Sequence, residues 1–174
     1  MNTTEIHIIF PNQLFKNSEI LDPIENIILI EEYLFFNQYK FHKQKIAFHR
    51  ATMKAYEDYL SNKGKKVTYI NAKSEWSDIR KLLPKLEEEG TSKIHIIDPT
   101  DNWLEKHIHQ FKGALDINWY DNPLFINTKK ELSTFFKPTK KKFFQTSFYK
   151  TERKNRNILM DGKNPRGAQL TFDS

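Results

Sequence analysis

The sequence predicts an α/β fold, in which a five-stranded parallel sheet carries helices on both faces. Short, mostly apolar runs of four to six residues recur along the first 120 residues, and Ile27–Ile30 is continuous enough for a strand buried on both faces. Longer stretches with helical spacing of apolar residues separate these runs, which is typical of a parallel sheet. The expected strands are residues 5–10, 27–30, 67–70, 94–97 and 115–120.

The longest predicted helix begins at Lys43 and ends before Gly64, which suits a left-handed residue after a helix. Apolar residues at helical spacing should face the sheet. Aromatic, histidine and basic residues crowd the first two turns, so we expect this end to form one wall of a ligand pocket. The expected apolar stripe contains Ile46, Met53, Tyr56 and Leu60, widened by Ala47, Ala51 and Ala55.

Two shorter helices complete the predicted layers. Ser74 is a suitable N-cap for a helix that runs through residues 79–86 to Gly90, and Pro84 should kink or shorten it. The next helix begins near Asp101 or Asn102, after the strand closed by Asp98-Pro99. Because strands and helices alternate in this order, the architecture should be Rossmann-like, with right-handed crossovers.

A basic helical linker should follow the sheet. Thr128 and Glu131 have the spacing of a capping box for a short helix that ends at Phe136, and residues 147–160 again have a helical pattern. We therefore expect an α/β domain over residues 1–136, and a basic linker and junction over residues 137–174. The end of the chain, from Lys163, lacks periodicity and resembles a tail cut from something longer.

The net charge of the chain is +6, and it is concentrated in residues 137–156. This segment contains eight Lys and Arg residues and one Glu, so its charge is +7 and the rest of the chain carries −1. Four aromatic residues are interleaved with these charges. Two interpretations remain open: a solvated linker between domains, or a surface that contacts phosphates and bases through Lys140, Lys141 and Lys142.

Composition narrows the class of protein. The chain has no cysteine, so we expect no disulfide and no thiolate metal site. No stretch approaches the roughly 20 apolar residues of a membrane span, and the run Ile6–Phe10 is too short for a signal peptide. A cytoplasmic protein without a membrane partner is the expectation. His107 and His109 should point to different sides of a helix, so we expect no metal pair there.

A ligand site is expected past the carboxyl ends of the strands, where parallel sheets bind their ligands. It should be built by the loop 11–14, the segment 31–38 and the loop 98–103. No Gly-rich phosphate loop follows the first strand, which disfavours a dinucleotide or nucleoside triphosphate held that way. The candidate binding residues are Pro11, Asn12, Gln13, Glu31, Phe35, Gln38, Lys45 and His49.

Each candidate has a plainer interpretation. Asn12 and Gln13 are also ordinary turn residues. Glu31 could bond a ring nitrogen or a ribityl hydroxyl, or be a surface carboxylate. His42 and His49 suit helix capping or the edge of the core better than ligation. No catalytic arrangement, such as a Ser-His-Asp set or paired carboxylates, is expected.

Three stretches carry a resemblance to a known family. The turn Asn12-Gln13-Leu14 is similar to that family's Asp-Gln-Leu turn. Residues 31–53, with His42-Lys43-Gln44-Lys45, resemble its most recognisable signature, and residues 148–173 resemble its junction to a second domain. The chain thus resembles the N-terminal domain of the prokaryotic photolyase-related, iron–sulfur branch of the cryptochrome/photolyase family.

The resemblance implies an antenna domain that holds a light-harvesting pigment, either 6,7-dimethyl-8-ribityllumazine or another ribityl or flavin-type ring. In the family, a helical domain follows, with FAD and a four-cysteine iron–sulfur cluster, and the full-length protein repairs pyrimidine photoproducts in DNA. We expect that domain to be missing here, so this chain should not be an enzyme by itself. The alternative is a stand-alone nucleotide- or nucleic-acid-binding module on the same fold.

The sequence departs from the family pattern inside the expected site. Asn12 replaces an Asp and Pro11 replaces a Gly, while Phe35 and Gln38 replace a Glu and a Tyr of the lumazine-binding members. The identity of the pigment is therefore open. In the junction, Ala168 and Leu170 replace a Gly and an aromatic residue, so different packing is expected there.

Overall fold

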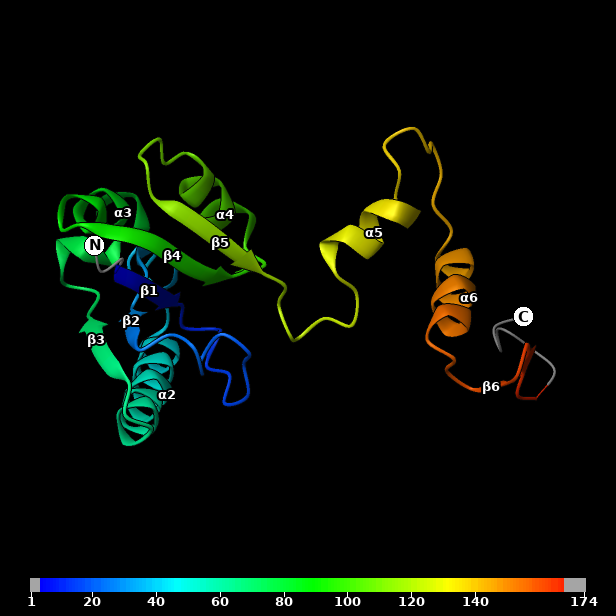
Figure 1. The fold of residues 1–174 in the computed structure, drawn as a ribbon, viewed down its shortest axis with the longest axis horizontal. Coiled ribbons are helices and arrows are strands. Elements are labelled where there is room, and N and C mark those ends of the chain that lie inside the picture. Colours follow the sequence, from blue (N-terminus) through cyan, green and yellow to red (C-terminus); the bar gives the residue numbers. More distant parts are fainter. Residues whose placement is uncertain (1–3, 168–174) are drawn as a thin grey trace. The chain divides into compact units, whose positions relative to one another are not determined.

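A computed structural model describes residues 4–167, which form two compact units that divide after Leu124 (Figure 1). The first unit contains a five-stranded sheet in the order β3-β2-β1-β4-β5, and every neighbouring pair is parallel. The predicted parallel α/β fold is therefore confirmed. Its strands are β1 (Thr4–Ile9), β2 (Asn26–Ile30), β3 (Lys66–Ile70), β4 (Thr91–Ile97) and β5 (Asp116–Tyr120).

Helices cover both faces of the sheet, as predicted (Figure 1). Helices α3 (Ile79–Glu88) and α4 (Asn102–His109) pack on the face that carries Ile8 and Ile28. Helices α1 (Tyr33–Phe36) and α2 (Lys43–Asn62) pack on the face that carries Ile9 and Leu29. Successive side chains of a strand point to opposite faces, so each buried strand contributes to both cores.

Helix α2 buries a narrower stripe than the sequence predicted. Met53, Tyr56 and Leu60 are buried against the sheet. The prediction that alanines widen this stripe is wrong, because Ala47, Ala51 and Ala55 are all exposed. With 3.6 residues per turn, this alanine row lies on the far side of the helix from Met53.

The helix ends are capped by local hydrogen bonds. The Nδ1 atom of His42 accepts a hydrogen bond from the backbone N–H of Gln44 at 3.2 Å, so its predicted role as a helix cap is confirmed. Ser74 caps the 3-10 helix η1 (Glu75–Ser77), whereas Asp78 caps α3, so the predicted cap belongs to a different helix. Pro84 does not shorten α3, which continues to Glu88.

The second unit contains helices α5 (Lys129–Phe135) and α6 (Gln145–Asn155), followed by the antiparallel pair β6 (Met160–Asp161) and β7 (Asn164–Pro165). The capping box predicted at residues 128–131 is present. The predicted helix over residues 147–160 is wrong at its end, because Asn157 and Leu159 adopt left-handed conformations. The expected junction residues Ala168, Leu170 and 172–173 lie outside the described residues. No helix within residues 4–167 is long and apolar enough to cross a membrane.

Candidate functional site

Gln13 joins the loop after β1 to the end of β4. Its Nε2 atom donates hydrogen bonds to the carbonyl oxygens of Ile97 at 2.9 Å and Asp98 at 3.0 Å. Beside it, the Nδ2 atom of exposed Asn12 donates to the carbonyl of Pro99 at 3.2 Å. The Gln13 side chain is buried, and its Oε1 atom has no partner within the described part of the chain. A buried acceptor without a donor is rare in folded proteins, so a water molecule or a ligand that reached this atom would complete its hydrogen bonding.

Glu31 directly follows β2, on the α2 side of the sheet, and is fully buried, so it is not a surface carboxylate. Its two oxygens accept hydrogen bonds from Nε and Nη2 of Arg50, each at 2.6 Å. They also accept from the Tyr69 hydroxyl at 2.6 Å and from the backbone N–H of Ala72 at 2.8 Å. Burial alone would raise the pKa of Glu31, but these four donors lower it.

Glu32 lies on the opposite face of the sheet, beside the start of α3. Its oxygens accept from the backbone N–H groups of Leu34 at 2.5 Å and Ile79 at 3.4 Å. Burial raises the pKa of this carboxyl to about 7, and the charge of nearby Asp78 acts in the same direction. Sequence reasoning missed this residue, although a carboxylate with a pKa near neutrality is typical of functional sites.

Aromatic and aliphatic side chains bring three predicted segments together at the carboxyl edge of the sheet, where the parallel strands end. Leu14 from the loop after β1, Phe35 and Phe36 from α1, and Ile46 from α2 belong to one packed cluster. The ring of His49 lies 6.1 Å from that of Phe36, between centroids, which matches its predicted place at the edge of the core. The loop 11–14, the segment 31–38 and the start of α2 therefore meet, as predicted.

The remaining candidate residues of this edge differ in exposure. Pro11 is buried and Gln38 is half-buried, whereas Lys45 is exposed, with its Nζ atom 3.8 Å from the centre of the Phe41 ring. Burial lowers the pKa of His49, and the charge of Lys45 lowers it further. His49 is thus neutral near pH 7, and its ring can pack or accept a hydrogen bond.

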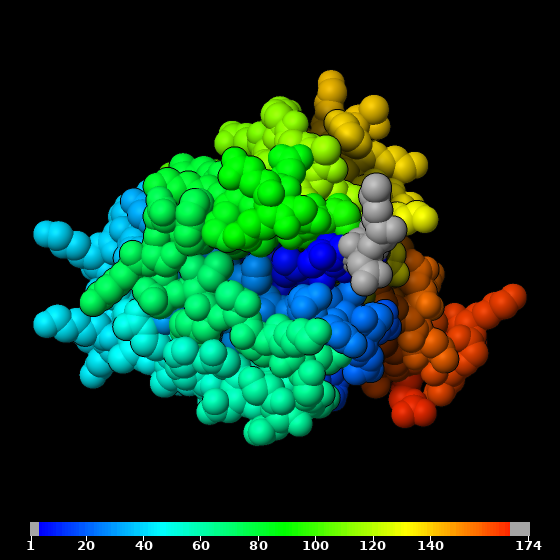
Figure 2. Space-filling model, turned by 60° about the vertical axis from the view of Figure 1, so that its left-hand side comes forward, coloured from blue at the N-terminus to red at the C-terminus, as the bar shows by residue number. Residues whose placement is uncertain are grey.

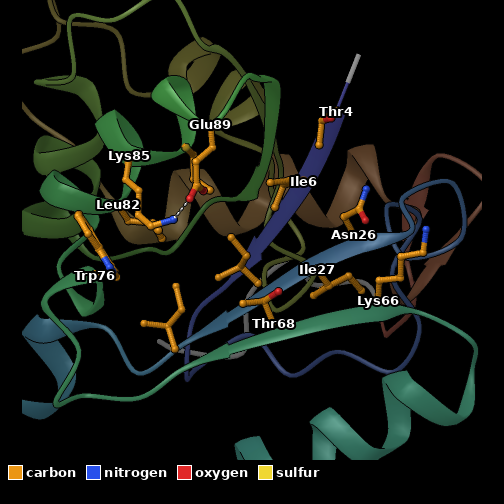
Figure 3. A pocket seen from close by; sticks show the side chains of 13 residues that line it. Thr4, Ile6, Asn26, Ile27, Lys66, Thr68, Trp76, Leu82, Lys85 and Glu89 are labelled. Carbon is orange, nitrogen blue, oxygen red and sulfur yellow. Dashed lines mark hydrogen bonds and ion pairs between the residues drawn. The ribbon is translucent and has the colours of Figure 1, made fainter. Parts of the chain in front are cut away.

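A groove that the sequence did not predict lies between α3 and the strands β2 and β3 (Figure 3). Its volume is about 330 Å³. Trp76 lies toward one end and Lys66 toward the other, and an ion pair between Lys85 and Glu89 lies on the α3 side. Figure 2 shows this side of the molecule, where blue atoms of the first strands are visible between green and blue-green parts of the chain. The groove exists because α3 leaves the edge strand partly uncovered.

Metal ligands do not gather in the described residues. Within residues 4–167, no group of three or more His, Asp or Glu side chains is placed to hold a metal ion. The ring of His109 stacks on Trp119 with centroids 4.9 Å apart, and the Nδ1 atom of His107 is buried without a partner there.

The family described as deoxyribodipyrimidine photo-lyase-related protein matches residues 7–174. The chain belongs to this family. It is also 37% identical over 180 residues to "Uncharacterized protein R852" of Acanthamoeba polyphaga mimivirus, covering 97% of this chain and 91% of that protein. It is 23% identical over 183 residues to a "(6-4) photolyase" of Agrobacterium fabrum, covering 98% of this chain.

Membership of the photolyase-related family confirms the predicted resemblance at the level of the family. The chain spans 35% of the length of the bacterial (6-4) photolyase, whereas it spans nearly all of the mimivirus protein. These two relatives thus differ greatly in length. Assignment to the iron–sulfur branch, and the role as an antenna, remain predictions.

Proposed function

We propose that this photolyase-related chain is a chromophore-binding module whose ligand is 6,7-dimethyl-8-ribityllumazine or another ribityl or flavin-type ring. The observation that carries the proposal is the buried, unpartnered Oε1 atom of Gln13 at the carboxyl end of the central strand. Ligands of open parallel sheets bind at this edge. Membership of the photolyase-related family supports the choice of a light-absorbing ring as the ligand.

The residues at this edge fit such a ring in part. The Oε1 atom of Gln13 would accept a hydrogen bond from a ring N–H or a ribityl hydroxyl. Phe35 would supply an apolar wall, while Asn12 and Gln38 would face the polar side chain of the ligand. Glu31 does not fit a direct contact, because four donors already surround its two oxygens. Its role in the proposal is to fix the position of α2.

The bound ring would absorb light and transfer excitation to a flavin elsewhere. The residues of this chain would only bind the ring, orient it and exclude water. Without cysteine, the chain cannot hold an iron–sulfur cluster by thiolates. A separate FAD-binding domain with such a cluster, DNA as the partner of the full-length protein, light-driven repair and a cytoplasmic location all belong to this proposal.

Titration with 6,7-dimethyl-8-ribityllumazine and with riboflavin, followed by fluorescence polarisation, tests the proposal. We expect saturable binding of one ring below millimolar concentration. The substitution Gln13→Leu should weaken it about five- to tenfold, since it removes the Oε1 acceptor and also the two hydrogen bonds that Nε2 donates to Ile97 and Asp98. Asn12→Ala changes an exposed neighbour and should have a smaller effect. Absence of saturable binding for both rings would refute the proposed function.

A second variant distinguishes the proposed site from the groove. Thr68 lines the groove on β3, so Thr68→Trp should fill part of it without touching the loop 11–14. We expect this variant to bind the ring normally. If Thr68→Trp abolishes binding while Gln13→Leu leaves it unchanged, the ring binds in the groove and the site is wrongly placed.

A further inference from the structure

The second unit carries the positive charge of the chain. Residues 125–167 contain twelve Lys and Arg residues and three Asp and Glu residues. Residues 1–124 contain sixteen Lys and Arg residues and eighteen Asp and Glu residues. The second unit is therefore strongly basic, at +9, and the first is slightly acidic, at −2. Such asymmetry favours a polyanionic partner for the second unit.

The arginines of this unit are used to hold its own structure. The buried guanidinium of Arg153 donates to the carbonyl oxygens of Ile158 at 3.0 Å and Leu159 at 2.7 Å. Arg156 forms ion pairs with Glu131 at 3.1 Å and Glu152 at 3.0 Å. Arg153 and Arg156 are therefore poorly placed for a phosphate. The third arginine, Arg166, is 69% exposed and forms a longer ion pair with Asp161 at 3.4 Å, so most of the charge available to a partner comes from lysines.

Several lysines of the same unit are exposed and unpaired. The side-chain ammonium groups of Lys141, Lys142, Lys150 and Lys154 make no hydrogen bond or ion pair to any described residue. Lys150 and Lys154 lie one turn apart on the same side of α6. Lys140 differs, because its Nζ atom lies 4.2 Å from the centre of the Phe135 ring. Four lysines thus present free ammonium groups within 14 residues of chain.

Two aromatic residues, Phe144 and Tyr149, stand between these lysines in the sequence and lie outside the aromatic cluster of the unit. That cluster consists of Phe135, Phe136, Phe143 and Phe148, whose contacting rings have centroids 5.0–5.2 Å apart. Phe144 is 61% exposed and Tyr149 is 43% exposed, and neither ring contacts another ring in the described residues. Exposed rings beside free lysines are typical of surfaces that stack bases and bind phosphates.

We propose that residues 141–154 of the second unit bind single-stranded nucleic acid. Lys141, Lys142, Lys150 and Lys154 bind phosphates, and Phe144 and Tyr149 stack on bases. A single strand is favoured over a duplex, because the faces of paired bases are covered by their neighbours. This surface is separate from the chromophore site, requires no photoproduct, and does not depend on the proposed function.

The full chain should bind a fluorescein-labelled oligothymidine of about 15 nucleotides with micromolar affinity at about 100 mM salt, measured by anisotropy. Four phosphate contacts predict a log–log salt slope of about −3 for a single strand. The double variant Lys141→Gln/Lys142→Gln should halve this slope. The matched control, Lys106→Gln/Lys112→Gln, removes two exposed lysines of the first unit and should leave the slope unchanged.

The aromatic contribution has a separate readout. Phe144→Leu and Tyr149→Leu keep apolar side chains but remove the rings, and each should weaken binding to the oligonucleotide about fivefold or more. Neither should change binding to dextran sulfate, which has charges but no bases. Far-UV circular dichroism checks that α6 remains folded in both variants.

Three results would overturn the proposal. The first is no binding of the oligonucleotide at about 100 mM salt. The second is equally tight binding of dextran sulfate, which would show that the lysines bind any polyanion and that the rings recognise no bases. The third is displacement of the oligonucleotide by phosphatidylserine vesicles at an equal concentration of negative charge, which would indicate a membrane surface instead.

Discussion

Replacing Arg50 with methionine is expected to lower the free energy of unfolding of the first unit by about 3 kcal/mol at pH 8, near the low end for broken buried ion pairs. The substitution leaves the carboxylate of Glu31, which is fully buried, without its two strongest donors. The loss stays near the low end because Tyr69 and Ala72 still donate to that carboxylate, and because the Arg50 side chain is 47% exposed.

Urea denaturation followed by tryptophan fluorescence measures this loss. Trp76, Trp103 and Trp119 are the only tryptophans of the chain and all lie in the first unit, so the signal reports on that unit alone. The matched control is Arg50→Met in a Glu31→Gln background, where we expect less than about 1 kcal/mol, since no buried charge is left unpaired. Equal losses in both backgrounds would show that the ion pair does not stabilise the unit.

Glu32 should make the first unit less stable as the pH rises toward neutrality. Its pKa is about 7 in the folded protein, against an ordinary value of 4.5. Between these values the folded state holds a proton that the unfolded state has released, so raising the pH through this window removes up to about 3 kcal/mol of stability. Glu32→Gln cannot ionise, and it should gain about that much relative to the natural protein between pH 5 and pH 8.

The difference between the two proteins isolates Glu32 from other groups. Burial lowers the pKa of His7 to about 4, so His7 removes stability as the pH falls below about 6.5, the opposite direction. That contribution is the same in both proteins and cancels. Glu88→Gln, which removes the same charge at an exposed position of α3, is the control and should not reproduce the gain of Glu32→Gln. A Glu32→Gln advantage that is equal at pH 5 and pH 8 would contradict the prediction.

The strands could be predicted because buried strands consist of short runs of apolar residues, which are visible in the sequence. The ends of α6 and the cap of α3 could not. Leu159 adopts a left-handed conformation that local preference disfavours in a branched residue, and the Arg153 bonds to the carbonyls of residues 158 and 159 stabilise it. Ser74 and Asp78 are both good caps, and only the tertiary structure shows which helix each one begins.

In the candidate site too, some features could be predicted from the sequence and others could not. Sequence placed Glu31 at the end of β2, but its partners Arg50, Tyr69 and Ala72 are far along the chain and could not be identified from spacing. Glu32 had a usable signal. Adjacent residues of a strand point to opposite faces, so two consecutive carboxylates after a buried strand must serve different layers. Glu31 accepts hydrogen bonds from Arg50 of α2, and Glu32 accepts one from the backbone N–H of Ile79 at the start of α3.

The exposed alanine row of α2 makes this chain convenient for optical distance measurements. The chain contains no cysteine, so Ala51→Cys would provide its single thiol, on the helix surface away from Met53 and the sheet. A maleimide dye attached there would touch none of the residues that pack α2 or surround Gln13. Because Met53, Tyr56 and Leu60 hold α2 against the sheet, the efficiency of resonance energy transfer from a bound lumazine to this dye would report the distance between the ring and the helix surface.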